Sequence, residues 1–588
     1  MNTPAIDSAY KFVDSKLIIR IRDRVCESPD ELISSQLFRE VLERFVQELA
    51  RRDSPLMAMF GKPADQIVET DLDSLVKTIQ VFARVQMEWA TKLLDDSRFI
   101  ENPEELRVFV EGLYDYWRKF ERFLVCDSAG DVLDQRPYRT FNSTVESLTN
   151  MVRGTYREVQ ENLTGRHPRI YRQVSAGAEV AAIALPKELP GLGKYAARLE
   201  SVPVIRQVLL YPPMLLNPPM NKRTGSFERV KVNPLDLVDM DGGEWLCYPA
   251  RVGKLLVLVY FHEMFFELGF TLSNLFELAD DATLQQKPEA IFLFGVPEDS
   301  LDHLAELPTV FYDDGDILVG AVPRRAEFGY FGYLKKMILT LHNIKVMQAG
   351  NMPFHGAMVA LQLKGGKSAN ILLFGDTGAG KSETLEAFRS LAGAQIREMT
   401  IVADDMGSLD FAPDGRILAY GTEIGAFVRL DDLQPGYAFS QLDRSIIMNP
   451  NQTNARVVLP VTSYGNVVRG FPVEIVLYAN NYELVDAEHP VVAPFTTPAA
   501  ALEAFREGAA MSKGTTTSTG LVHTYFVNVF GPLQYRDLHD KIAQRFFEGF
   551  FEQKTLVAQL RTRLGLPGWE HSGPELAAKA LLELLEER

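Results

Sequence analysis

The sequence predicts a mixed α/β protein with an additional all-helical domain at its N-terminus. Two observations predict this fold class. Apolar residues recur at helical spacing over residues 1–165, whereas short β-type apolar runs alternate with a few helices from about 225 to 530. A chain of 588 residues is also too long for one ordinary core. We therefore expect several domains.

The N-terminal domain is predicted from three amphipathic segments that are separated by short proline-containing breaks. In the clearest of them, 72–94, the apolar positions are Leu72, Leu75, Val76, Ile79, Phe82, Trp89 and Leu93. The segments 37–50 and 106–124 show a similar helical spacing of apolar residues. Such a stripe normally packs into a bundle core, and the alternative is a surface that binds a protein partner.

Composition and charge narrow the class of protein. The chain is 46% apolar and 24% charged, as in globular proteins, and it contains no apolar run of the ~18 residues that a spanning helix needs. The net charge of −17 disfavours nucleic acid as a partner. Cys26, Cys126 and Cys247 form neither a disulfide framework nor a zinc pattern, and the N-terminus lacks the features of a signal peptide. We expect a cytoplasmic protein that does not bind membranes.

A phosphate-binding loop is the most specific motif. An apolar strand, 370–374, leads into a segment that fits G-x-x-x-x-G-K-[ST], and a helix-compatible segment follows. The segment comprises Gly375, Asp376, Thr377, Gly378, Ala379, Gly380, Lys381 and Ser382. Glycines allow backbone N–H groups to surround a phosphate, the lysine reaches the terminal phosphates, and the serine hydroxyl can bind Mg²⁺.

Several polar residues near this loop have two possible explanations each. Asp404 and Asp405 follow an apolar run and would suit either a divalent metal or a solvated turn. His355 begins another apolar run, where a lone histidine is usually structural. Lys335 and Lys336 would ordinarily form a solvated helix face.

Taken together, these motifs resemble the phosphoenolpyruvate carboxykinase family, most closely its ATP-dependent branch. The resemblance rests on "YFGYLKK", "MPFHGAMVAL", the phosphate-binding loop, "VADD" and "NARVVLP", and covers about 200–560. The wording "GDTGAGKSET" is also similar to HPr kinase, whose fold contains the same nucleotide half.

The resemblance implies a carboxykinase-like P-loop fold with mixed sheets. Its parts would be an N-terminal lobe, a nucleotide-binding lobe and C-terminal helices, at 166–350, 351–535 and 536–588. The domain at 1–165 belongs to neither family.

The resemblance also implies a nucleotide and metal site. Lys381 would bind the β- and γ-phosphates of ATP, and Ser382 would ligate Mg²⁺. A second metal, commonly Mn²⁺, would be held by Lys336, His355 and Asp405, the lysine acting only when deprotonated.

The implied acceptor site is less complete. Lys335 and Arg456 would neutralise the transferring phosphoryl group, and Tyr330 would line the substrate pocket. The substrate-carboxylate arginine of the family has no clear counterpart, so Arg223 and Arg229 are the candidates. Where the family has a further lysine, this chain has Ala426, with Arg429 nearby.

We expect an ATP- and metal-dependent phosphotransferase that acts on a small anionic substrate. The first expectation is the family reaction, conversion of oxaloacetate and ATP into phosphoenolpyruvate, ADP and CO₂. The second is a protein or small-molecule kinase with Asp404 or Asp405 as the base. The third is an ATP-binding sensor or scaffold without turnover, to which the N-terminal domain would bring a protein partner.

Overall fold

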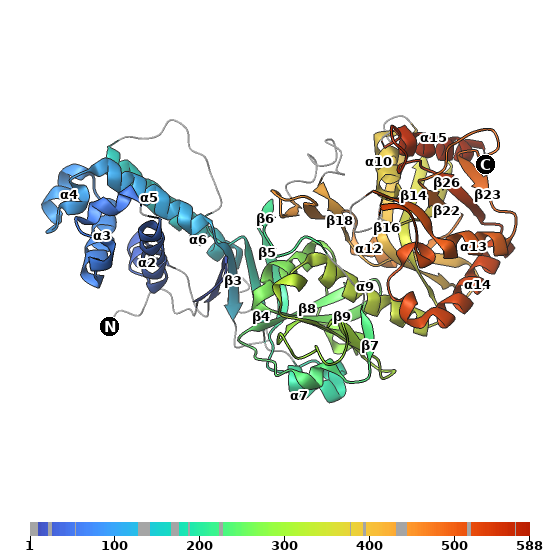
Figure 1. Ribbon diagram of the computed structural model, residues 1–588, viewed down its shortest axis with the longest axis horizontal. Helices are drawn as coiled ribbons and strands as arrows, with labels where there is room; N and C mark the ends of the chain where they lie inside the picture. The colour runs from blue at the N-terminus through green and yellow to red at the C-terminus, as the bar shows by residue number, and fades with distance from the viewer. Residues whose placement is uncertain are drawn as a thin grey trace. The chain divides into compact units, whose positions relative to one another are not determined.

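The computed structural model describes residues 10–21, 26–52, 54–127, 141–165, 176–185, 188–222, 227–376, 378–391, 395–430, 444–513, 519–570 and 572–587. The chain is a mixed α/β protein with large mixed sheets (Figure 1). It divides into two compact units. Unit 1 comprises Met1–Lys187 and Ile205–Tyr211, and unit 2 comprises Glu188–Val204 and Pro212–Arg588.

Unit 1 combines helices with a sheet. Its helices are α1 (Pro29–Ile33), α2 (Gln36–Arg51), α3 (Glu69–Phe82), α4 (Met87–Leu93), α5 (Pro103–Arg118) and α6 (Phe141–Thr164). Its strands, in sheet order, are β1 (Tyr10–Val13), β2 (Lys16–Ile21), β3 (Glu121–Asp127), β4 (Val180–Leu185) and β5 (Val204–Leu210). Helix α2 begins with a side-chain cap, since the Ser35 hydroxyl accepts a hydrogen bond from the Phe38 N–H at 3.1 Å.

The prediction of an all-helical domain over 1–165 is therefore wrong. The segment 106–124, which the sequence suggested to be one helix, ends its helix at Arg118 and enters β3 at Glu121. Strands β2, β3 and β4 pair in parallel, and each contains a run that is apolar and buried on both faces, at 17–19, 123–126 and 180–185. A short continuous apolar run of this kind lacks the alternation that separates a strand from a helix.

The first sheet of unit 2 precedes the phosphate-binding loop. Its strands, in sheet order, are β8 (Trp245–Val252), β9 (Leu255–His262), β11 (Ala290–Val296), β13 (Leu318–Pro323), β12 (Val310–Tyr312) and β7 (Glu228–Val230), with β10 (Glu277–Leu278) paired to β8. Helix α9 (Phe331–Gln348) packs against both this sheet and the next one. It is buried on nearly all sides, so its polar residues face protein.

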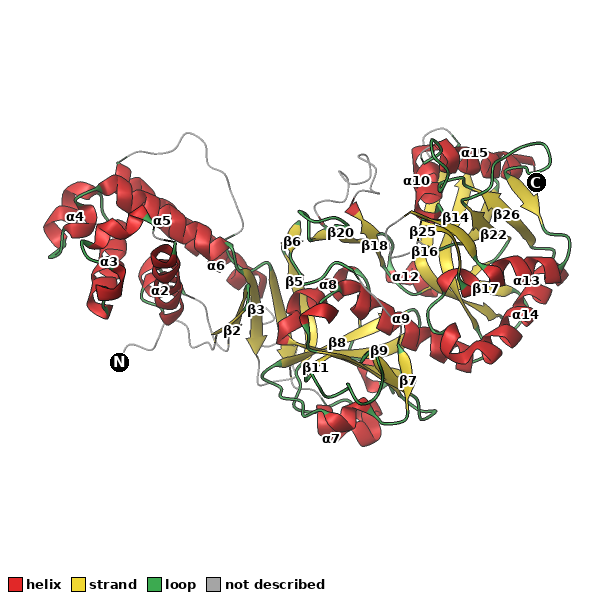
Figure 2. Cartoon of the chain, in the orientation of Figure 1, coloured by secondary structure: helices red, strands yellow, loops and turns green. Residues whose placement is uncertain are grey.

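The second sheet carries the loop. Its order is β21 (Phe471–Pro472), β17 (Ile417–Gly421), β16 (Ile396–Phe411), β14 (Met352–Leu363), β15 (Ser368–Phe374), β22 (Ile475–Asn480), β26 (Leu556–Arg561) and β23 (Val492–Pro494). Helices α10 (Lys381–Leu391) and α15 (Ser572–Glu587) cover one face (Figure 2). Phenylalanines from α13 (Pro498–Glu507) and α14 (Arg536–Glu552) pack on the other face.

The described part of unit 2 also contains two small sheets and three short α-helices. One sheet has the order β18 (Gly425–Arg429), β20 (Arg456–Pro460), β19 (Ile446–Met448) and β6 (Met214–Leu216), and the other pairs β24 (Ala509–Lys513) with β25 (Thr519–His523). The short helices are α7 (Ala196–Leu199), α8 (Phe266–Thr271) and α12 (Tyr464–Val468).

The predicted domain borders agree only in part with the two units. Unit 1 continues beyond residue 165 to include β4 and most of β5, so the predicted part 166–350 is shared between the units. The border at 350 falls between α9 and β14, and that at 535 falls directly before α14. Both lie inside unit 2. Among the described residues, no helix is both long and apolar enough to cross a membrane.

Candidate nucleotide and metal site

The phosphate-binding loop joins β15 to α10, as the sequence predicts. Gly378 and Gly380 have φ of +78° and +99°, a backbone conformation that favours glycine. A Cβ atom at Gly380 would lie only 2.8 Å from Thr562. The loop is held from outside, since the Thr562 hydroxyl donates to the Ala379 carbonyl at 2.8 Å and Asn481 donates to the Gly378 carbonyl at 2.9 Å. Thr377 and the side chain of Ser382 lie outside the described residues.

Lys381 is the first residue of α10, and its side chain is buried. Its Nζ lies 3.5 Å from Asp405 Oδ1, close enough for an ion pair, but it makes no hydrogen bond with the described part of the chain. A buried ammonium without hydrogen bonds is costly unless an anion meets it. This arrangement suits the terminal phosphates of a nucleotide.

Asp405 lies within a strand and not at a strand end or in a turn, contrary to both sequence interpretations. Strand β16 continues to Phe411, and Asp405 pairs with Gly356 on β14. Its φ of +126° is rare for a residue with a side chain and departs from regular strand geometry. In a regular strand pair, Asp405 and His355 would project from opposite faces, because Asp405 pairs with Gly356 and not with His355. The irregular backbone at Asp405 lets the two side chains meet. Asp404 pairs with Ala357 and is half-buried.

His355 connects Asp405 to the turn at 526–528, whose three residues have positive φ. Its Nδ1 lies 2.5 Å from the Val527 carbonyl oxygen, and its Nε2 lies 2.9 Å from Asp405 Oδ1. Because a carbonyl can only accept, Nδ1 carries a proton. Nε2 then has two options, to be protonated and pair with Asp405, or to present its lone pair beside a carboxylate. The second option is the usual state of a metal-binding histidine.

The lysine that reaches Asp405 is Lys335 and not Lys336. Lys335 Nζ lies 2.6 Å from Asp405 Oδ2 and 3.1 Å from Glu423 Oε1. Burial alone would lower the pKa of Lys335, but the two carboxyl groups outweigh it and raise the pKa, so the group stays an ammonium. Lys336 Nζ instead lies 4.7 Å from the centre of the Phe530 ring. Successive residues of a helix point about 100° apart, so only one of the pair can face Asp405.

The residues predicted to form the acceptor site lie around the ring of Phe427 on β18. The rings of Tyr330 and Phe427 are 6.1 Å apart, Lys335 Nζ is 5.8 Å from the Phe427 ring, and the Arg456 guanidinium is 5.4 Å from it. Arg429 is directly opposite Arg456 in the β18–β20 pair. Since Arg429 is also two residues from Phe427, it projects from the same face of the sheet. The sequence had placed Arg429 only near an expected lysine.

Glu423 was missed by the sequence analysis. Burial and the neighbouring Asp405 carboxylate raise the pKa of Glu423 from 4.5 to about 8, although Lys335 acts in the opposite direction. The neighbouring Asp405 shifts in the opposite direction. Its pKa is lowered well below its usual range, because Lys335, His355 and Lys381 outweigh the effect of burial. An acidic residue between Tyr420 and Phe427, in an otherwise apolar segment, was the available signal.

Of the two candidate arginines for a substrate carboxylate, Arg229 makes its described contacts outside this group. Arg229 lies on β7, where its guanidinium is 3.5 Å from Asp313 and 5.1 Å from the ring of Tyr535. Its side chain is half exposed. Arg223 lies outside the described residues.

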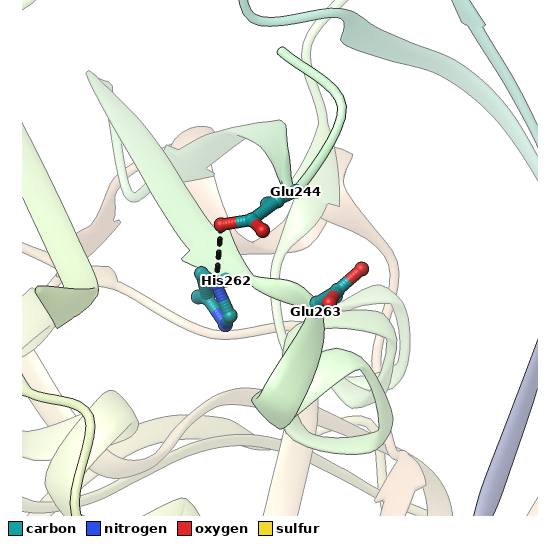
Figure 3. Close-up of side chains that lie close together, drawn as sticks. All are labelled: Glu244, His262 and Glu263. Atoms are coloured by element: carbon teal, nitrogen blue, oxygen red, sulfur yellow. Dashed lines mark hydrogen bonds and ion pairs between the residues drawn. The ribbon is translucent and has the colours of Figure 1, made fainter. Parts of the chain in front are cut away.

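A separate acidic cluster occurs in the first sheet of unit 2. Possible ligand atoms of Glu244, His262 and Glu263 lie within 4.8 Å of one another (Figure 3). However, Arg324 Nη1 is 2.6 Å from His262 Nε2, which itself lies 3.3 Å from Glu244. A guanidinium therefore already faces the ring nitrogen that a metal would need. We interpret this cluster as a network of ion pairs.

Comparison with protein-family models gives no match for this chain, and comparison with curated proteins gives no significant match. The resemblance to phosphoenolpyruvate carboxykinase therefore stays a prediction.

Proposed function

We propose that unit 2 is an ATP- and divalent-metal-dependent phosphotransferase. The observation that carries this proposal is the buried, non-hydrogen-bonded Lys381 ammonium at the end of a glycine loop, next to the Asp405–His355 pair. A loop of this kind binds the phosphates of a nucleoside triphosphate through backbone N–H groups, the lysine and the helix N-terminus.

The metal part of the proposal rests on His355 and Asp405. The Val527 carbonyl fixes the His355 tautomer in which Nε2 can bind a cation, and Asp405 supplies a carboxylate oxygen beside it. We do not include Lys336 or Lys335 as a ligand, because the first lies over Phe530 and the second keeps its proton. When bound there, a divalent cation would neutralise charge on the acceptor and on the transferring group.

The remaining side chains provide fixed positive charge and one proton carrier. Lys335, Arg456 and Arg429 place cations around Phe427, where they would stabilise charge that develops during phosphoryl transfer. Glu423, with a pKa of about 8, can hold a proton at neutral pH and release it close to Lys335.

For the acceptor we propose two candidates. The first is oxaloacetate, which loses CO₂ to form an enolate whose oxygen attacks the γ-phosphorus of ATP, giving phosphoenolpyruvate and ADP. The second is a hydroxyl compound or a protein serine, deprotonated by a carboxylate of the site. The contacts of Arg229 with Asp313 and Tyr535 favour the second candidate. An arginine engaged in these contacts does not serve a substrate carboxylate.

The test is an assay of the purified protein with ATP and either Mg²⁺ or Mn²⁺. Oxaloacetate and a panel of hydroxyl acceptors would be compared, with ADP and the phosphorylated product both measured. Phosphoenolpyruvate formation supports the first candidate, and phosphorylation of a hydroxyl supports the second. Absence of ATP binding, measured by calorimetry, would refute the proposed function for both.

A further inference from the structure

Two arginines face each other on a strand pair beside the candidate site. Strands β18 and β20 are antiparallel neighbours (Figure 2), and Arg429 on β18 pairs directly with Arg456 on β20. Both residues are partly exposed, which leaves them accessible to a small solute. Like charges that lie directly opposite each other destabilise a strand pair. An anion bound between the two guanidinium groups would reverse this effect.

Arg456 has no counter-ion within the part of the chain that the structure describes. It forms no ion pair there, and its buried Nε has no hydrogen-bond partner in the same ranges. Its guanidinium instead lies 5.4 Å from the centre of the Phe427 ring. By contrast, Lys335 is paired with Asp405 and Glu423. An arginine whose charge the described chain does not neutralise is suited to receive an anion from solution.

Two adjacent guanidinium groups favour a phosphate monoester over a carboxylate. Each guanidinium donates through a planar fork that matches the oxygens of either group. A phosphate monoester offers three terminal oxygens and a charge of about −1.5 to −2 at neutral pH, whereas a carboxylate offers two oxygens and a single charge. One phosphate group can therefore satisfy both forks, but the forks would compete for one carboxylate.

The ring of Phe427 connects the arginine pair to the residues proposed for phosphoryl transfer. The Arg456 guanidinium lies 5.4 Å from the centre of this ring, and Lys335 Nζ lies 5.8 Å from it. Lys335 Nζ is in turn 2.6 Å from Asp405 Oδ2. A compound with a short carbon chain would place its phosphate at the arginines, pack its carbons on the ring and present a hydroxyl on the Lys335 side.

We propose that the acceptor is a small hydroxyl compound that already carries a phosphate monoester, which Arg429 and Arg456 bind together. This inference rests on the proposed function and specifies the second of its two acceptor candidates. The acceptor hydroxyl oxygen would form a bond to the γ-phosphorus of ATP while the bond from that phosphorus to the β–γ bridging oxygen breaks. ADP leaves with the electron pair of the broken bond, and the hydroxyl proton passes to a carboxylate of the site. The product would carry two phosphate groups.

The first test measures the binding of probes while the nucleotide site is filled. Full-length protein saturated with Mg²⁺ and ADP would be titrated with glycerol 3-phosphate, glycerate and glycerol, and ligand-observed NMR would follow binding. We expect saturable binding of glycerol 3-phosphate, at least tenfold tighter than that of glycerate, and no measurable binding of glycerol. Equal or tighter binding of glycerate, or no binding of glycerol 3-phosphate by the ADP complex, would overturn the inference. Failure to bind ADP would instead refute the proposed function, and the inference would fall with it.

The second test assigns the phosphate to the arginine pair. Arg429→Met should weaken binding of glycerol 3-phosphate at least tenfold and leave ADP affinity unchanged, and Arg429→Gln provides the same test if the methionine variant does not fold. Arg469→Met is the matched control, because Arg469 is an exposed arginine of the same unit that also lies beside a phenylalanine, 4.3 Å from the ring of Phe471. Native probe binding without the Arg429 guanidinium would overturn the inference. An equal loss of ADP affinity would do the same, since it would place Arg429 in the nucleotide site.

Discussion

Lys381 makes the nucleotide proposal testable in the ligand-free protein as well as in the complex. Its ammonium is buried and lacks hydrogen bonds with the described residues, so it should destabilise the free protein while it serves binding. We expect Lys381→Met to lower ATP affinity by tenfold or more, about 1.4 kcal/mol or more, and to leave the melting temperature of the free protein unchanged or higher. Calorimetry and thermal unfolding would measure the two effects.

The matched control for this variant is Lys579→Met. Lys579 is an exposed lysine that forms an ion pair with Glu575 on the same helix, so its replacement should change neither property. If Lys381→Met bound ATP with native affinity, the assignment of Lys381 to the nucleotide site would be wrong.

His355 separates the metal proposal from the nucleotide proposal. If Nε2 and Asp405 hold a cation, Mn²⁺ should bind to the nucleotide-free protein, and electron paramagnetic resonance would detect it. We expect His355→Ala to lose this Mn²⁺ while it retains ATP affinity. Because His355 also donates to Val527, the variant His355→Asn, which can keep that hydrogen bond, distinguishes loss of a ligand from a disturbed turn. Native Mn²⁺ binding in both variants would return His355 to a structural role.

Glu423 predicts a pH dependence of stability. Its pKa is about 8 in the folded protein against 4.5 when unfolded, so between these values the folded state binds the extra proton. The free energy of unfolding therefore carries a contribution that is complete below pH 4.5 and is lost as pH rises through 8, at up to ~1.4 kcal/mol per pH unit. We expect Glu423→Gln, which mimics the protonated acid, to match the native protein near pH 5 and to be more stable than it at pH 9. Parallel denaturation curves at pH 5, 7 and 9 would show this, and an identical pH profile for the two proteins would contradict it.

The phosphate-binding loop is the element in which the sequence was most informative. Strand, glycine loop and helix occur where the motif predicts them, because the glycines at 378 and 380 encode a local backbone conformation. The unit 1 strands were not recognisable, because a buried parallel strand and a buried helix both present an unbroken apolar run. That Lys335 and not Lys336 reaches Asp405 has another cause. Their directions depend on how α9 is rotated against β14 and β16, which no local pattern encodes.

The sequence also could not predict which site residues meet through pairing between distant strands. Arg429 joins Arg456 through the register of β18 and β20, and Asp405 joins His355 through an irregular backbone in β16. Neither register nor a positive φ at a non-glycine residue can be inferred from residue type alone.

A substitution at Gly380 tests whether the backbone conformation of the loop is needed for ATP binding. An alanine there would need the +99° conformation and would place its Cβ 2.8 Å from Thr562. We expect Gly380→Ala to cost about 1–3 kcal/mol of stability and to abolish ATP binding, as measured by denaturation and calorimetry. Gly365→Ala is the control, since its Cβ would meet nothing within 4 Å and its φ is not in the left-handed range. Unchanged ATP binding in Gly380→Ala would show that the loop does not hold phosphate in this conformation.

For the molecule as a whole, the net charge hides a local concentration of positive charge. The chain carries −17, yet the region around Asp405 and Phe427 brings together Lys335, Lys381, Arg429 and Arg456. A negative total charge repels polyanions such as nucleic acid at long range, while a cationic pocket can still bind a small anion at short range. Both properties suit an enzyme that acts on nucleotides and small anions.

The division into two compact units predicts that a nucleotide stabilises one part of the chain. A ligand that binds only the folded state stabilises the unit that holds it, by RT ln(1 + [L]/Kd), about 2.7 kcal/mol at a hundredfold excess over Kd. We therefore expect ATP with Mn²⁺ to slow amide exchange in β14, β15, α10 and β16 of unit 2 and to leave exchange in α5 and α6 of unit 1 unchanged. Hydrogen–deuterium exchange with mass spectrometry on the full-length protein would resolve these segments, and Lys381→Met should remove the protection. If ATP protected both units equally, the two units would unfold as one cooperative body.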